Sequence, residues 1–177
     1  AYGHAFVILA AAWAARVGIE GAREMLDRCW HFMEAHFYEP AHGAYADERD
    51  QSLARLDGYR GQNANMHTVE ALITAYESTG ETMFLERADS VARKFTVDLA
   101  AAADGQVWEH YSTDWTHDWE YNIDKPDDLF KPWGFQPGHQ VEWAKLLLQI
   151  DTHKPADWHL TVAVSLFDTA MKKGWDR

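Results

Sequence analysis

His-Thr-Val-Glu at residues 67–70 and His-Gln-Val-Glu at residues 139–142 are the stretches that decide the fold class. Each stands near the start of a stretch with helical hydrophobic spacing, and His4 takes the same place in an earlier one. A pattern that returns at intervals of this size indicates a repeated supersecondary unit. The sequence therefore predicts helical hairpins that each begin with a histidine-bearing helix.

Six helices are expected, arranged in three pairs, because apolar residues recur on one face of six stretches. A short turn joins the two members of each pair, and long connections at residues 38–62 and 103–138 separate the pairs. Strand signals are weak and are confined to residues 43–47 and 106–111. The expected helices cover residues 2–17, 20–37, 63–78, 81–102, 139–150 and 156–173.

Repeated helical hairpins predict an all-α fold in which inner and outer helices form a ring, an (α/α) toroid or barrel or half of one. In such a ring the inner helices direct their N-terminal side chains to one end of a central cavity, where the three histidines would converge. An open solenoid of stacked hairpins is the alternative. Because the chain starts within a helical pattern and stops on a turn-like sequence, we expect residues 1–177 to be a single partial domain, the central part of the barrel.

Composition excludes several classes of partner. The chain has 16 Lys and Arg against 28 Asp and Glu, a net charge of -12, so a nucleic-acid partner is not expected. Cys29 is the one cysteine, which rules out a disulfide framework. The longest apolar run, residues 5–15, is too short to cross a bilayer. No basic segment precedes an apolar one at the start, so we expect a cytoplasmic protein that contacts no membrane.

The repeated His-x-x-Glu pattern suits proton transfer. Residues three apart share one face of a helix, so His67 with Glu70 and His139 with Glu142 form local pairs. A carboxylate beside an imidazole fixes its tautomer and raises its basicity, as a general base near neutral pH requires. The positive N-terminal end of the helix disfavours the imidazolium and so lowers the basicity of a histidine near it. Buried histidines that only bridge helices are the structural alternative.

Other chemistries remain as alternatives. Two histidines and two glutamates could bind a metal ion, but their order reverses the usual di-metal motif, so we expect no metal. The pair Asp127 and Asp128 suggests glycoside hydrolysis, or else a solvated loop. The nine tryptophans either stack on sugars or pack in the core.

Four segments give the chain a resemblance to a known family. They are Tyr-Gly-His-Ala-Phe at 2–6, Arg-Gly-Gln-Asn-Ala-Asn-Met-His-Thr-Val-Glu-Ala at 60–71, Pro-Gly-His-Gln-Val-Glu-Trp at 137–143, and Leu-Phe-Asp at 166–168 with Gly-Trp-Asp at 174–176. With these segments the chain resembles the N-acylglucosamine 2-epimerase superfamily. It is most similar to the D-mannose isomerase and sulfoquinovose isomerase branch, which Trp143 after Glu142 favours.

The resemblance implies an (α/α)6 toroid or barrel, of which this chain is a partial segment. It also implies an aldose–ketose isomerase that acts on a monosaccharide of the mannose type without a cofactor. A histidine removes the C2 proton and a cis-enediol(ate) forms. By motif, the catalytic residues are His139, His67 and Glu142, and the substrate-binding residues are Asn63, Tyr2, Glu70, His4, Arg60 and Trp133. A sugar 2-epimerase of the N-acylglucosamine or cellobiose type, which shares the intermediate, and a non-catalytic carbohydrate-binding helical domain are the alternatives.

The chain departs from the family in one respect. The family has a further catalytic histidine in its last inner helices and an arginine near its N-terminus, and neither is matched within residues 1–177. We therefore expect the fragment by itself to be inactive. Uncovered apolar helix faces would favour a homo-oligomer.

Overall fold

Helices dominate the computed structural model, which describes residues 1–175. All six predicted helices are confirmed, with ends that differ from expectation by a few residues. After α4 the chain stays helical but changes its winding, first to the π-helical segment η1 (Lys94–Leu99) and then to the 3₁₀ turn η2 (Ala100–Ala103). The helices are α1 (Tyr2–Arg16), α2 (Ala22–His36), α3 (Gln62–Thr79), α4 (Thr82–Arg93), α5 (Pro137–His153) and α6 (Asp157–Gly174).

The chain divides into two compact units, and both α3 and α4 run from one unit into the other. The first unit comprises Ala1–Asp57 and Ala64–Val91, and the second comprises Gly58–Asn63 and the chain from Ala92 onward. The expectation that residues 1–177 form a single domain of the barrel stays a prediction. Asp176, which belongs to the last matching segment, lies outside the described residues.

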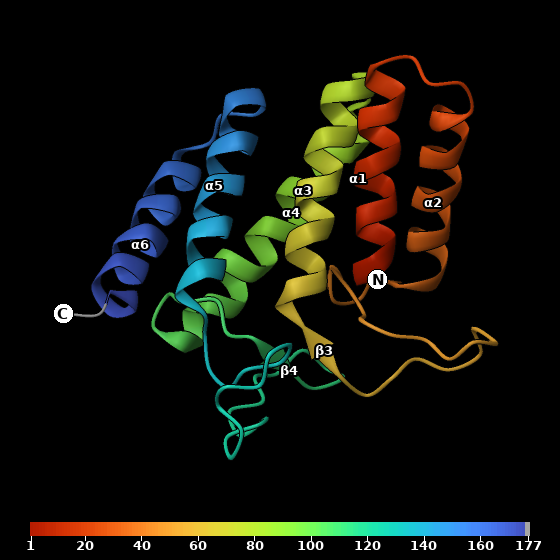
Figure 1. Cartoon of the computed structure of the whole chain (residues 1–177). Helices are drawn as coiled ribbons and strands as arrows, with labels where there is room; N and C mark the ends of the chain where they lie inside the picture. Colours follow the sequence, from red (N-terminus) through yellow and green to blue (C-terminus); the bar gives the residue numbers. More distant parts are fainter. Residues whose placement is uncertain (176–177) are drawn as a thin grey trace. The chain divides into compact units, whose positions relative to one another are not determined.

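In the first unit α1 and α2 pack side by side (Figure 1). Ile8 of α1 and Leu26 and Met33 of α2 are fully buried. The indole of Trp30 on α2 meets the ring of Phe84 on α4 edge-on, with centroids 5.3 Å apart. Apolar contacts of this kind are the main source of stability for helices of this length.

The predicted strand signal at residues 43–47 is confirmed as one arm of a small hairpin. Strand β1 (Tyr38–Glu39) pairs antiparallel with β2 (Ala44–Tyr45). Asn65, from the first turns of α3, holds the hairpin with both halves of its amide: Oδ1 accepts from the Tyr45 N–H and Nδ2 donates to the Tyr45 carbonyl, each at 2.8 Å. Because Asn65 is fully buried, both bonds are shielded from water.

In the second unit α5 and α6 pack along their lengths (Figure 1). An aromatic core lies beneath α5. The rings of Phe95 and Trp143 stack nearly parallel, with centroids 5.8 Å apart and planes 16° apart. Tyr111 and Trp115 meet Phe95 edge-on. Part of the tryptophan content is therefore core packing.

A second antiparallel pair links distant parts of the chain. The signal at residues 106–111 is confirmed as β4 (His110–Tyr111), but its partner is β3 (Arg60–Gly61), which the sequence analysis did not predict. Gly61 pairs with His110 and Arg60 with Tyr111. This pairing sets the start of α3 beside the connection that precedes α5.

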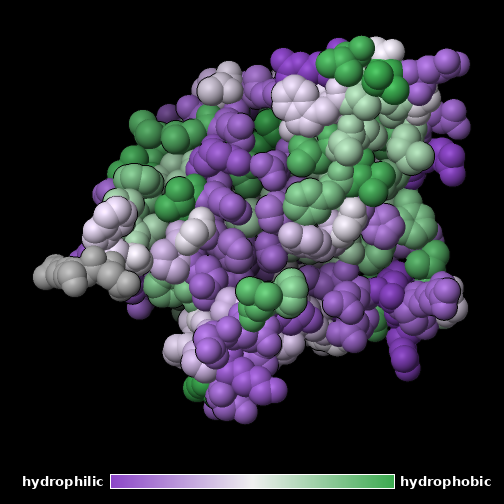
Figure 2. Space-filling model, viewed as in Figure 1, coloured by the Kyte–Doolittle hydropathy of each residue, from purple (hydrophilic) through white to green (hydrophobic). Residues whose placement is uncertain are grey.

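The outer face of the α5–α6 pair is apolar. Figure 2 shows hydrophobic side chains gathered over α6. Leu148 of α5 with Leu160, Val164 and Phe167 of α6 line a groove there, and each is about half exposed. The expectation of a homo-oligomer stays a prediction. No helix within residues 1–175 is both long and apolar enough to cross a membrane.

Candidate functional site

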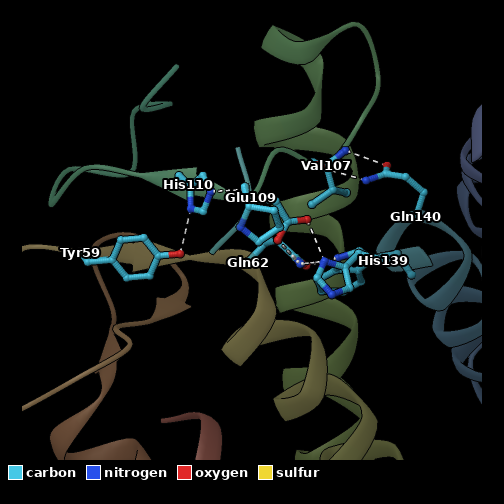
Figure 3. A network of polar contacts seen from close by, with 9 residues as sticks. Tyr59, Gln62, Val107, Glu109, His110, His139 and Gln140 are labelled. Atoms are coloured by element: carbon cyan, nitrogen blue, oxygen red, sulfur yellow. Dashed lines mark hydrogen bonds and ion pairs between the residues drawn. The ribbon is translucent and has the colours of Figure 1, made fainter. Parts of the chain in front are cut away.

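His139 is the third residue of α5, and Pro137 opens that helix. Proline suits the first helical position because its ring presets the backbone angle and its missing N–H is not needed there. The His139 side chain is 25% exposed and contacts the protein interior through Nδ1. Nδ1 lies 2.8 Å from Oε1 of Glu109 (Figure 3).

Glu109 is held rigidly, although it belongs to no helix. Its side chain is only 4% exposed. Its backbone N–H donates to the Gly134 carbonyl at 3.0 Å, and its own carbonyl accepts from the Gln62 N–H at 3.1 Å. Val107, two residues before Glu109, is held by the side-chain amide of Gln140 on α5. The Val107 N–H donates to Oε1 of Gln140 at 3.0 Å, and Nε2 of Gln140 donates to the Val107 carbonyl at 2.9 Å (Figure 3). The carboxylate is thus presented to His139 from a fixed backbone.

Gln62 completes the network from the first residue of α3. Its Nε2 donates to Oε2 of Glu109 at 3.0 Å and lies 2.8 Å from Nδ1 of His139. Its Oε1 accepts from the indole N–H of Trp143 at 2.7 Å. Gln62 and Trp143 are both fully buried, so the network is dry on the side away from the imidazole.

The electrostatics of His139 favour its protonated form. Burial lowers the pKa of His139. The hydrogen bond that its ring donates to Glu109, the charge of Glu109 and the charge of Glu142 together outweigh burial, so the pKa lies above the ordinary value. The two carboxylates therefore prevail over burial. Glu142 acts through its charge, whereas the hydrogen-bonding carboxylate is Glu109 rather than the expected partner three residues along the helix.

The second predicted pair lies on α3 in the first unit. Nδ1 of His67 contacts Oε2 of Glu70 at 3.2 Å, as the spacing predicts. The ring of Tyr2 meets His67 edge-on with centroids 5.3 Å apart, and Phe6 lies 4.9 Å away. Tyr2, His67 and Glu70 are therefore brought together by α1 and α3.

Asn63 begins the same helical face as His67, four residues earlier on α3. Its Oδ1 is buried and has no hydrogen-bond partner in the part of the chain that the structure describes. A buried acceptor without a partner is costly, and its presence is typical of a functional position. This observation fits the predicted substrate-binding role, which stays a prediction.

Two further residues that the sequence predicts for the site, His4 and Arg60, have other neighbours. His4 stacks on Phe32 with centroids 5.0 Å apart, and burial lowers its pKa, so its ring contacts are with α2 rather than with His67. Arg60 in β3 is buried and donates to the Tyr59 carbonyl. Their roles in substrate binding stay predictions.

Trp133 belongs to a group of indoles on the long connection before α5. It meets Trp108 at a right angle, with centroids 5.7 Å apart, and donates its indole N–H to the Trp119 carbonyl. Trp133 is 37% exposed and directly precedes Gly134, the residue that anchors Glu109. An exposed indole so close to the His139 network suits contact with a sugar ring, which stays a prediction.

His110 follows Glu109, and both of its ring nitrogens are bonded. Nε2 lies 2.6 Å from the Pro132 carbonyl, and Nδ1 lies 3.0 Å from the Tyr59 hydroxyl. Burial lowers the pKa of His110 more than the Pro132 carbonyl and the charges of Glu109 and Asp118 raise it. The arrangement anchors the loop and leaves no ring nitrogen for chemistry.

Two alternative site chemistries receive no support from the geometry. Within residues 1–175 no three histidine, cysteine or acidic side chains gather as metal ligands. Asp128 uses Oδ1 to accept from the backbone N–H groups of Phe130 and Lys131, as a loop-forming residue does.

Glu109 and Gln62 are the residues that sequence reasoning missed. Gln62 lies inside the matching segment at residues 60–71, next to Asn63, and a polar residue at the start of a buried helix is a signal that could have found it. Glu109 carries no such signal, because it is 30 residues from His139 in a stretch without helical spacing.

Known proteins similar to this chain support the resemblance seen in its sequence. The N-acylglucosamine 2-epimerase (GlcNAc 2-epimerase) family matches residues 1–177. The chain is similar to a D-mannose isomerase of Marinomonas mediterranea, with 47% identity over 99% of this chain and 45% of that protein. A D-mannose isomerase of Thermobifida fusca is 39% identical over 99% of this chain and 44% of that protein. The chain thus spans less than half the length of these relatives.

Solved structures agree with this relation. A crystal structure of D-mannose isomerase superposes with a TM-score of 0.96 at 46% identity, covering 99% of this chain and 45% of that one. A cellobiose 2-epimerase from Spirochaeta thermophila gives a TM-score of 0.80 at 17% identity, covering 97% of this chain and 43% of that one. The second match shows a shared fold alone.

Proposed function

Because the chain belongs to the N-acylglucosamine 2-epimerase family, we propose that the whole protein is an aldose–ketose isomerase that interconverts mannose-type sugars and their ketoses. The observation that carries the proposal is the His139–Glu109 contact at 2.8 Å. It holds one imidazole nitrogen in the protein interior, on a side chain that remains 25% exposed. A partly exposed imidazole backed by a buried carboxylate is equipped to take up and return a proton.

The reaction moves two protons. The imidazole of His139 removes the C2 proton of the open-chain aldose, and the electron pair of that bond forms the C1–C2 double bond of a cis-enediolate. The imidazolium N–H exchanges with water and then delivers a proton to C1, while the hydroxyl proton passes from O2 to O1 and the C2 carbonyl forms. The raised pKa of His139 suits this task, because the imidazolium must persist long enough to deliver that proton.

We assign the other residues to the sugar. His67, supported by Glu70, contacts the substrate near its reacting carbons, and Tyr2 lies against His67. Asn63 offers its unpartnered Oδ1 to a hydroxyl. These assignments extend the family motif to this chain and form part of the proposal.

Isomerisation is preferred over epimerisation because the relatives of highest identity given above are D-mannose isomerases. The cellobiose 2-epimerase shares only the fold. Both reactions pass through the same intermediate and differ in whether C1 or C2 receives the proton.

Proton NMR of mannose in D2O, with the whole protein and a chelator, tests the proposal. Fructose that carries deuterium at C1 is the expected product, and His139→Gln is expected to abolish it. His153→Gln, a histidine change at the other end of α5, is the matched control and should leave the rate within about twofold. Glucose with deuterium at C2 would assign the protein as an epimerase, and sugar binding without exchange in any aldose would assign it as a binding domain.

A further inference from the structure

Glu109 has no role in the motifs that identify the family, yet its carboxylate lies against the proposed base. We propose that Glu109 is the positioning residue for His139: it keeps the proton of the neutral imidazole on Nδ1, so that Nε2 is the nitrogen that exchanges a proton with the substrate. The inference rests on the proposed function, and it adds a residue and a tautomer to it.

The carboxylate has one defined partner for each oxygen. Oε1 lies 2.8 Å from Nδ1 of His139, and Oε2 accepts from Nε2 of Gln62 at 3.0 Å. The backbone of Glu109 is anchored at both its N–H and its carbonyl, so its side chain extends toward His139 from a fixed position. A buried carboxylate of this kind needs donors, and Nδ1–H supplies one.

Gln62 offers the opposite arrangement, in which Nδ1 carries no proton and accepts from the amide, because Nε2 of Gln62 also lies 2.8 Å from Nδ1. The indole N–H of Trp143 decides the orientation of the amide: it donates to Oε1 of Gln62 at 2.7 Å, which turns the amide nitrogen toward Glu109 and His139. If Nδ1 accepted from that nitrogen, its lone pair would face a carboxylate oxygen at 2.8 Å. With the proton on Nδ1, both contacts of the carboxylate are favourable, and the Gln62 amide nitrogen donates to Oε2 of Glu109 and makes no hydrogen bond to Nδ1.

The tautomer has a consequence for the reaction. A proton fixed on Nδ1 leaves a lone pair on Nε2, which removes the C2 proton and becomes N–H. The resulting imidazolium carries its charge beside Glu109, which stabilises it without accepting the proton. When a proton is delivered to C1, the imidazole is again in its starting state. Glu109 therefore prepares His139 for each turnover.

Glu142 provides a matched contrast. Both glutamates raise the pKa of His139 by their charge, but only Glu109 makes a hydrogen bond to the ring. Removing the charge of Glu142 should lower the pKa of His139 and leave the tautomer unchanged. Removing the carboxylate of Glu109 should change both.

Nitrogen-15 NMR of the histidine rings in the whole protein without sugar tests the proposal directly. The neutral tautomers give different shifts for the two ring nitrogens, and the His139→Gln spectrum identifies the signals of His139. The unmodified protein is expected to show the proton on Nδ1. The tautomer is thus read from the unmodified protein, with a variant used only to assign the signals, and a proton found on Nε2 would overturn the proposal.

Two leucine substitutions then separate the neighbours of Nδ1. Glu109→Leu leaves only the Gln62 amide N–H beside Nδ1, so the proton should move to Nε2. Gln62→Leu leaves the carboxylate, so the proton should stay on Nδ1. With Glu109→Leu, kcat on mannose should fall about 10²–10⁴-fold with KM changed less than about threefold. An unchanged tautomer in Glu109→Leu would refute the positioning role.

The two readouts distinguish the proposals. A tautomer that inverts in Glu109→Leu, in a protein that turns over no aldose, would leave the positioning role intact and refute the isomerase assignment. Turnover of mannose that Glu109→Leu leaves unchanged would support the isomerase assignment and refute the positioning role of Glu109.

Discussion

Replacing Gln140 by alanine tests how the backbone that carries Glu109 is held. Gln140 is fully buried, and its amide bonds both the N–H and the carbonyl of Val107 at 3.0 and 2.9 Å. Val107 is also fully buried, so water does not replace the lost partner. Each buried backbone group left unpaired costs about 1–3 kcal/mol. The expected loss in the free energy of unfolding is therefore about 2–6 kcal/mol.

Urea denaturation and amide hydrogen exchange measure this change. A loss of this size moves the urea midpoint down by about 1–3 M at an ordinary slope. Exchange at the Val107 amide should accelerate more than exchange at the amides of α5, because the Gln140 Oε1 that accepts from the Val107 N–H is removed. Gln149→Ala, an exposed glutamine on the same helix, is the control and should stay within about 0.5 kcal/mol. Equal stability of the two variants would refute the reasoning.

Three further predictions concern other contacts. Asn65→Ala should cost about 2–6 kcal/mol in urea denaturation, because it unpairs two backbone groups of Tyr45. Glu142→Gln should move the acid limb of the kcat profile to lower pH, because the charge that raises the pKa of His139 is lost. A shift to higher pH would contradict this. His110 is held neutral by burial, so stability should fall as pH decreases below about 6.5, and His110→Gln should flatten that dependence in paired denaturation curves.

The helices could be predicted because their signal is local. The apolar face of α2 or of α6 consists of residues three or four positions apart, so the hydrophobic periodicity suffices to predict the helix. The contact between His67 and Glu70 could be predicted for the same reason. The change of winding after Arg93 left no mark in the spacing of apolar residues.

The remaining features depend on residues far apart in the chain. Strand β3 was missed because two residues carry no alternation, and its pairing with β4 spans about 50 residues. Glu109 was missed for the same reason, and Glu142 was paired with His139 because it is three residues away on one helix. The position of His4 beside Phe32 follows from packing against α2, which the repeat alone does not specify.

The segment between Tyr111 and Gly134 is fastened at both ends close to Glu109. His110 bonds the Pro132 carbonyl, and Gly134 accepts from the Glu109 N–H. Because hydrogen bonds hold both ends of this loop, it can lengthen, shorten or exchange its side chains without displacing the carboxylate of Glu109. Leu129 and Phe130 lie within it and are more than four-fifths exposed. Diversification among relatives, or a library made in the laboratory, can thus alter the side chains displayed on this segment while the contact between Glu109 and His139 is kept.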